Sequence, residues 1–102
     1  MPRHDAEAAS ALPADGMVGV QVDGRQIVVG RAGGTLFAFL DRCPHAGAPL
    51  SRGRLDGATV TCQRHGWAFD VLTGQSVPDP SAFCLAKRPV SLEGGRVWVD
   101  LP

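Results

Sequence analysis

The stretches "CPHAGAPL" (residues 43–50) and "CQRHGWAFD" (residues 62–70) each bring a cysteine, a histidine and a glycine together within five residues. The first pair has the spacing C-x-H, the second has C-x2-H, and sixteen residues separate His45 from Cys62. Proline disfavours helix in the first stretch, and the glycine that follows each histidine allows the chain to curl tightly. Both stretches are therefore expected to be loops that present a thiol and an imidazole.

The chain around these loops has the pattern of short strands joined by turns. Alternating or continuous apolar runs predict strands at residues 17–22, 26–31, 35–40, 58–62, 67–71, 85–92 and 96–100. Turn signals stand at Asp23-Gly24, Gly33-Gly34, Asp56-Gly57, Thr73-Gly74 and residues 93–95. The run 35–40 is apolar on both faces and is expected to be a central, buried strand, whereas Pro89 places its strand at an edge or bulge. We expect an all-β sandwich or small barrel with both Cys–His loops at one end.

Length and composition fit one small domain. The chain has 102 residues, 44% of them hydrophobic, with 13 glycines, 8 prolines and no tyrosine, which is typical of a turn-rich β domain. Residues 1–11 show no periodicity and contain four alanines, so we expect a poorly ordered tail or one short helical turn there. The domain proper is expected over residues 12–102.

Charge and hydropathy exclude several classes of function. The formal net charge is zero, so no overall field favours nucleic acid or an anionic membrane. No apolar run is long enough to span a membrane, and the first ten residues lack the apolar segment of a secretory signal. We therefore expect a cytoplasmic protein, in which three cysteines point to metal binding or catalysis rather than to disulfides.

The ligand set Cys43, His45, Cys62 and His65 allows two metal sites. A structural zinc site is one, although zinc ligands in short motifs usually have two to four residues between them. One intervening residue favours ligands that reach two different metal atoms. Two thiolates and two imidazoles are also the ligands of the Rieske two-iron, two-sulfur cluster, which is the second possibility.

At this point the sequence resembles the Rieske-type ferredoxins, the electron carriers of bacterial aromatic-ring dioxygenase systems. The resemblance rests on the two Cys–His stretches, the "TG" that follows them and the proline loop at residues 78–80. It implies a Rieske-type sandwich of antiparallel sheets with a small cluster-binding subdomain over about residues 41–80. It also implies one 2Fe–2S cluster, with Cys43 and Cys62 on the inner iron and His45 and His65 on the outer iron. Further residues near the cluster would be Gly47, Pro49, Leu50, Gly66, Trp67 and Pro78.

Two departures from the family pattern matter. Ala48 and Arg64 stand where the cytochrome-complex branch has a disulfide, and Trp67 stands where that branch has a serine. Fewer hydrogen bonds to the cluster would leave its reduced form less stabilised, so we expect a potential at the low end of the Rieske range. The second departure is the polar N-terminus, which leaves the family's usual first strand missing or supplied differently.

Three functions follow from these observations. The first is a non-catalytic, monomeric one-electron carrier that receives electrons from a flavin-dependent NAD(P)H reductase. It passes them to a terminal ring-hydroxylating oxygenase through transient contacts and binds no small-molecule substrate. The second is a Rieske-like small subunit of an assimilatory nitrite reductase, and the third is a zinc-stapled structural or interaction module.

Two features outside the ligand set also have alternative interpretations. Cations surround the ligands, and they form either an ordinary solvated rim or a docking patch for an acidic partner: Arg42, Arg52, Arg54 and Arg64. Cys84 lies outside both motifs and is expected to be a small buried core thiol.

Overall fold

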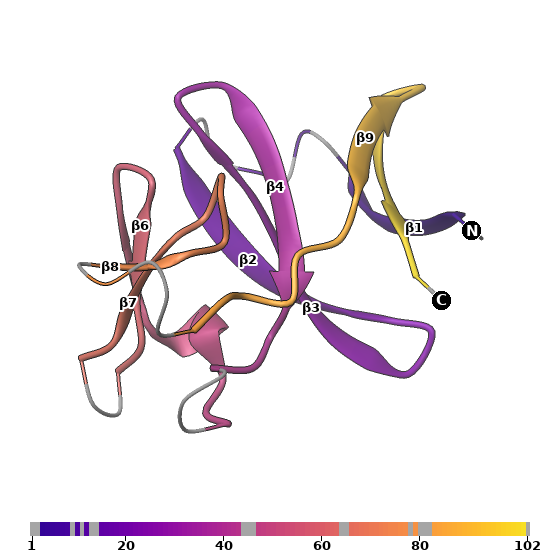
Figure 1. Ribbon diagram of the computed structural model, residues 1–102. Helices are drawn as coiled ribbons and strands as arrows, with labels where there is room; N and C mark the ends of the chain where they lie inside the picture. Colours follow the sequence, from indigo (N-terminus) through magenta and orange to yellow (C-terminus); the bar gives the residue numbers. More distant parts are fainter. Residues whose placement is uncertain are drawn as a thin grey trace.

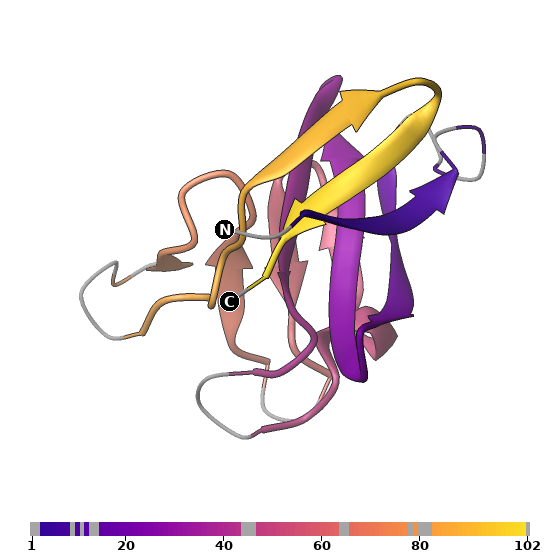
Figure 2. The same cartoon turned by 90° about the vertical axis from the view of Figure 1, so that its right-hand side faces the viewer.

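Three antiparallel sheets make up the fold (Figure 1). The structure is a computed structural model, and it describes residues 3–8, 10, 12, 15–43, 47–63, 66–77, 79 and 83–101. One sheet lies between the other two, as two perpendicular views show (Figures 1 and 2). The predicted all-β sandwich is confirmed.

The middle sheet has the strand order β2 (Gly16–Val22), β3 (Arg25–Ala32), β4 (Thr35–Leu40). Its two hairpins turn where predicted, with φ of 51° and 76° at Asp23 and Gly24, and 58° and 84° at Gly33 and Gly34. Two successive positive φ values are typical of the tight turns whose twist matches that of the flanking strands. The predicted burial of β4 on both faces is confirmed, but β3 is the central strand of this sheet.

Hydrophobic cores lie on both faces of the middle sheet, because successive side chains of a strand point to opposite faces. Val28 of β3 belongs to a core with Val60 and Phe69 of the third sheet. Its neighbours Ile27 and Val29 belong to a second core with Val97 and Val99 of the first sheet. The middle sheet is therefore the support on which both outer sheets pack.

The first sheet has the order β1 (Arg3–Ala8), β10 (Arg96–Asp100), β9 (Val90–Glu93). The expectation of a tail or helical turn was wrong for residues 3–8, because they form a strand that pairs with β10. Two exposed ion pairs join the strands of this sheet, Arg3 with Glu93 at 2.8 Å and Arg96 with Asp5 at 2.9 Å. The sequence led us to expect no edge strand from the polar N-terminus, but residues 3–8 form one.

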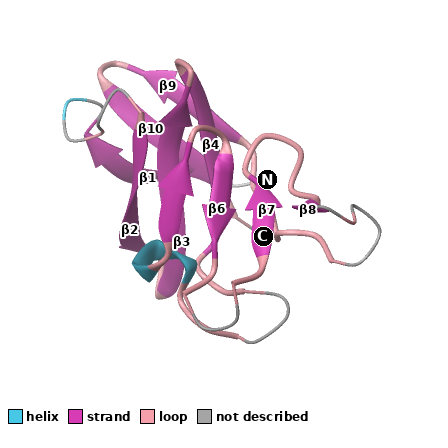
Figure 3. Ribbon diagram, turned by 90° about the vertical axis from the view of Figure 1, so that its left-hand side faces the viewer, coloured by secondary structure: helices cyan, strands magenta, loops and turns pink. Residues whose placement is uncertain are grey.

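The third sheet has the order β5 (Arg54–Asp56), β6 (Thr59–Thr61), β7 (Ala68–Asp70), β8 (Ser76–Val77). A 3-10 turn, η2 (Leu50–Arg52), leads into β5. The first Cys–His stretch follows β4, and the second joins β6 to β7. Both stretches leave the sheets at the same end of the molecule (Figures 2 and 3).

The strand predicted at 85–92 is regular only over β9. Before Pro89 the chain runs beside β4, where Lys87 forms an isolated bridge with Phe39 and the Arg88 N–H donates to the Ala38 carbonyl. The segment thus links the third sheet to the first across the middle one, which the local pattern could not reveal. Within the described ranges, no helix is long and apolar enough to cross a membrane.

Candidate metal centre

The two Cys–His loops share one backbone hydrogen-bond pattern. The Cys43 N–H donates to the Ala48 carbonyl at 2.8 Å, and the Gly47 N–H donates to the Cys43 carbonyl at 2.7 Å. In the second loop the Cys62 N–H donates to the Trp67 carbonyl at 2.6 Å, and the Gly66 N–H donates to the Cys62 carbonyl at 3.1 Å. In each loop, therefore, the cysteine N–H donates to the carbonyl five residues later, and the cysteine carbonyl accepts from the N–H of the glycine four residues later.

The conformation of the two glycines completes the correspondence. Gly47 and Gly66 both have φ of 71°, a left-handed conformation that costs a residue with a Cβ free energy. The sequence prediction that glycine lets each loop curl is confirmed at these two positions. The backbone groups of each cysteine and its glycine are paired in the same way, so the two cysteines stand in matching backbone environments.

Both cysteines are buried in the core. Cys43 and Cys62 are each 1% exposed, belong to the core that also holds Leu50, and form no disulfide. His45 and His65 lie outside the described residues, as do Arg64 and Pro78. Among the residues that are described, His, Cys, Asp and Glu side chains form no group of three or more that could hold a metal ion.

The loop that contains Cys43 is closed at its base by a contact that the sequence analysis missed. The Asp41 carboxylate accepts from the Ser51 N–H at 2.7 Å and from the Ser51 hydroxyl at 2.5 Å. Strand β2 packs against this pair, because a Cβ built at Gly19 would lie only 2.9 Å from the Ser51 Cβ. The sequence contained one sign of this contact, an aspartate before the Cys–His stretch and a serine after it. Such a pattern is too common to predict a hydrogen bond.

The loop that contains Cys62 is supported by aromatic packing. The rings of Trp67 and Phe83 meet edge to face, with centroids 5.0 Å apart and an interplanar angle of 86°. Phe83 is held by Ser76, whose N–H donates to the Phe83 carbonyl at 3.0 Å and whose hydroxyl accepts from the Phe83 N–H at 3.1 Å. Of the residues expected near a cluster, Trp67 thus stands on a fixed support, and sequence reasoning missed both Ser76 and Phe83.

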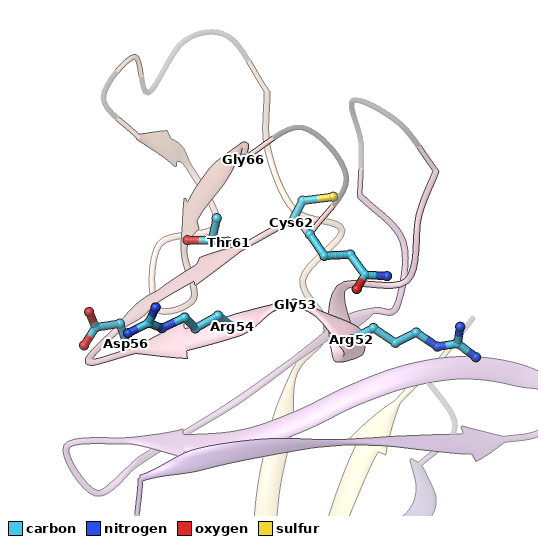
Figure 4. Close-up of a pocket in the computed structure, with 8 residues that line it drawn as sticks. Arg52, Gly53, Arg54, Asp56, Thr61, Cys62 and Gly66 are labelled. Carbon is cyan, nitrogen blue, oxygen red and sulfur yellow. The ribbon is translucent and has the colours of Figure 1, made fainter.

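The predicted cationic rim does not form a single surface. Arg42 lies against Gly47, with its Nε 3.7 Å from where a Cβ would be, and lines a hollow together with Arg25. Arg52 and Arg54 line a different hollow, which reaches Cys62 (Figure 4). All three rim arginines that the structure describes are exposed. The expectation of a buried Cys84 was wrong, because Cys84 is an exposed free thiol.

Two buried thiols on matched loops at one end of a β sandwich define a candidate metal-binding protein, and comparison with known proteins identifies the family. Residues 3–89 match the model of the Rieske [2Fe-2S] domain. The chain is 34% identical over 97 residues to the ferredoxin component of the naphthalene 1,2-dioxygenase system of Pseudomonas aeruginosa, covering 95% of this chain and 93% of that protein.

Solved structures agree with this match. The Sphingomonas yanoikuyae B1 ferredoxin has a TM-score of 0.86 at 27% identity, covering 96% of this chain and 97% of that one. A chain from the complex of reduced oxygenase and oxidised ferredoxin in carbazole 1,9a-dioxygenase has a TM-score of 0.83 at 34% identity, covering 94% and 99%. The chain belongs to the Rieske [2Fe-2S] domain family, and the relative at 34% identity is the ferredoxin component of a dioxygenase system. The cofactor that the family implies is one Rieske-type 2Fe–2S cluster.

Proposed function

We propose that this protein is a one-electron carrier that uses a Rieske 2Fe–2S cluster. The observation that carries the proposal is the pair of buried, disulfide-free thiols of Cys43 and Cys62 on two loops with the same hydrogen-bond pattern. These thiols fit the inner half of a Rieske cluster, which needs two thiolates on one iron. The proposed ligands of the outer iron are His45 and His65, which the sequence places in the same two loops.

The remaining proposed contacts come from the loops themselves. Gly47, Pro49, Leu50, Gly66 and Trp67 would surround the cluster, together with Pro78. Leu50 is fully buried in the core that also holds Cys43, and the Trp67 ring packs against Phe83, so these two side chains would keep water from the cysteine side. When bound, a cluster with two neutral imidazoles accepts an electron more readily than one with four thiolates, because it carries less negative charge.

The partners proposed for the carrier follow from its relatives. We infer that a flavin-dependent NAD(P)H reductase supplies the electron and that a terminal ring-hydroxylating oxygenase receives it, both through transient contacts with a cytoplasmic monomer. The relative at 34% identity is a ferredoxin component of a dioxygenase system. This favours an electron carrier over the two alternatives from the sequence, a nitrite reductase small subunit and a zinc-stapled module.

The proposal is tested by the metal content and the spectrum of the purified protein. We expect two irons and two acid-labile sulfides per chain, and an electron-spin resonance signal of the Rieske type on reduction. Cys43→Ser and Cys62→Ser should each lose the cluster and part of the folding free energy, because binding the cluster contributes to folding. Cys84→Ser is the matched control and should keep the cluster, since Cys84 is exposed. Protein reconstituted with iron and sulfide that still holds only zinc would contradict the proposal.

A further inference from the structure

A cationic pocket opens beside Cys62. Its volume is about 530 Å³, and its lining runs from the end of η2 through β5 and β6 into the second Cys–His loop. The residues that line it are Arg52, Gly53, Arg54, Asp56, Thr61, Cys62, Gln63 and Gly66. Two cations and one anion give this lining a net positive charge, and the three charged residues are exposed. The pocket therefore offers positive potential next to the proposed metal centre.

The two arginines stand on a rigid base. A Cβ built at Gly53, which lies between them, would be 2.1 Å from the Thr61 carbonyl oxygen, so the backbone of residue 53 packs directly on β6. Thr61 is the residue before Cys62, so the backbone that carries the two arginines has a fixed position relative to that cysteine. Figure 4 shows the Arg52 and Arg54 side chains leaving the backbone in opposite directions on either side of Gly53.

Neither arginine is neutralised by an ion pair within the described part of the chain. The ion pairs found there are Arg3–Glu93 and Arg96–Asp5, both on the first sheet. Asp56 lines the same pocket without coming within ion-pair distance of either arginine. A guanidinium group has donors arranged to bind a carboxylate through two hydrogen bonds, and a guanidinium group without an ion pair can bind the carboxylate of a partner.

We propose that this pocket, the Arg52–Arg54 pocket, is a docking point for an acidic electron-transfer partner, whose Asp or Glu carboxylates bind the Arg52 and Arg54 guanidinium groups. The inference rests on the proposed function, because it requires the cluster to lie beside Cys62. Arg42 is not part of the docking point, because it faces the other hollow with Arg25. Binding here would bring the partner to the end of the molecule where both Cys–His loops lie.

The test measures electron transfer from the reduced holoprotein to acceptors of known charge. The soluble haem domain of cytochrome b5 is the acidic probe, and cytochrome c is the basic probe. Stopped-flow traces at low salt give the second-order rate constants. Arg52→Glu and Arg54→Glu should each slow transfer to the acidic probe by about threefold or more, and high salt should remove the difference, because exposed charges act mainly on the rate of encounter.

Two control variants make the comparison specific. Arg31→Glu has the same change in charge but lies at the far end of β3, paired with Gly16 and Leu36, so its effect should be smaller. Asp56→Asn removes the anion of the pocket and should speed transfer to the acidic probe. With the basic probe all of these changes should reverse in sign.

The outcomes separate the two hypotheses. Absence of the cluster spectrum in the wild-type protein would overturn the proposed function. A normal cluster spectrum in every variant, with Arg52→Glu and Arg54→Glu no slower than Arg31→Glu, would overturn the docking point and leave the electron carrier intact.

Discussion

Removing the hydroxyl of Ser51 should make the protein lose its cluster faster. The first Cys–His stretch stands between Asp41 and Ser51 in the chain, and the Asp41–Ser51 contact closes its base through two hydrogen bonds of 2.7 and 2.5 Å. Ser51→Ala removes the hydroxyl bond and keeps the N–H bond. A hydrogen bond to a charged group contributes about 1.5–3 kcal/mol, and a free energy of about 1.4 kcal/mol corresponds to a factor of ten. The Asp41 carboxylate is half-buried, so water can replace part of the lost bond, and we expect the lower end of this range.

The expected result is therefore an approximately tenfold rise in the population of the opened loop. If opening exposes the cluster to attack, the rate of cluster loss should rise by the same factor. The assay follows the visible absorbance of the holoprotein in excess chelator at a fixed temperature. Ser91→Ala, an exposed serine on β9, is the matched control and should lose the cluster at the wild-type rate.

A Ser51→Ala variant that bleaches no faster than Ser91→Ala would refute the reasoning, because the closing contact would then contribute nothing to holding the loop. Asp41→Ala removes both bonds and leaves the Ser51 N–H without its acceptor, so it should bleach faster than Ser51→Ala. Gly19→Ala should act in the same direction from another strand, since its Cβ would displace Ser51.

Two further predictions concern packing. Gly30→Ala should lower the free energy of unfolding by about 1–3 kcal/mol, because a Cβ there would lie 2.5 Å from Cζ of Phe37. Thermal unfolding measures this loss, and a loss no greater than that of Ser91→Ala, which changes an exposed side chain of β9, would contradict the prediction. Phe83→Ala should make the Trp67 ring more accessible to iodide, because the substitution removes a ring whose centroid lies 5.0 Å away. Iodide quenching of Trp67 fluorescence measures this access, and unchanged quenching would contradict the prediction.

The sequence predicted the middle sheet well because its information is local. The Asp23-Gly24 and Gly33-Gly34 turns need positive φ, and glycine supplies it at little cost. Strand β1 was missed because its evidence is not local. Its residues "RHDAEA" offer only two small apolar side chains, Ala6 and Ala8, and they form a strand through pairing with β10, more than 80 residues away in the chain. The ion pair of Asp5 with Arg96 is a cross-strand contact that no window around residue 5 contains.

The same distinction holds for the candidate site. The motifs identified the cysteines, and burial of Cys43 and Cys62 agrees with a protected centre. The division of the arginines into two hollows depends on how η2 and β5 fold back on β6, which spacing along the chain does not show. Cys84 was assigned to the core from the usual behaviour of cysteine, but the segment around it crosses the surface between two sheets and leaves it exposed.

The different spacings of the two motifs, C-x-H and C-x2-H, could have meant loops of different size. The hydrogen bonds show otherwise, because each cysteine N–H reaches the carbonyl five residues on, Ala48 in one loop and Trp67 in the other. Each glycine four residues after its cysteine has the same φ of 71°. The loops are therefore the same size, and the histidine stands at the third position in one and the fourth in the other. The two cysteines are therefore held by equivalent backbone hydrogen bonds, although the position of the histidine differs between the two sequences.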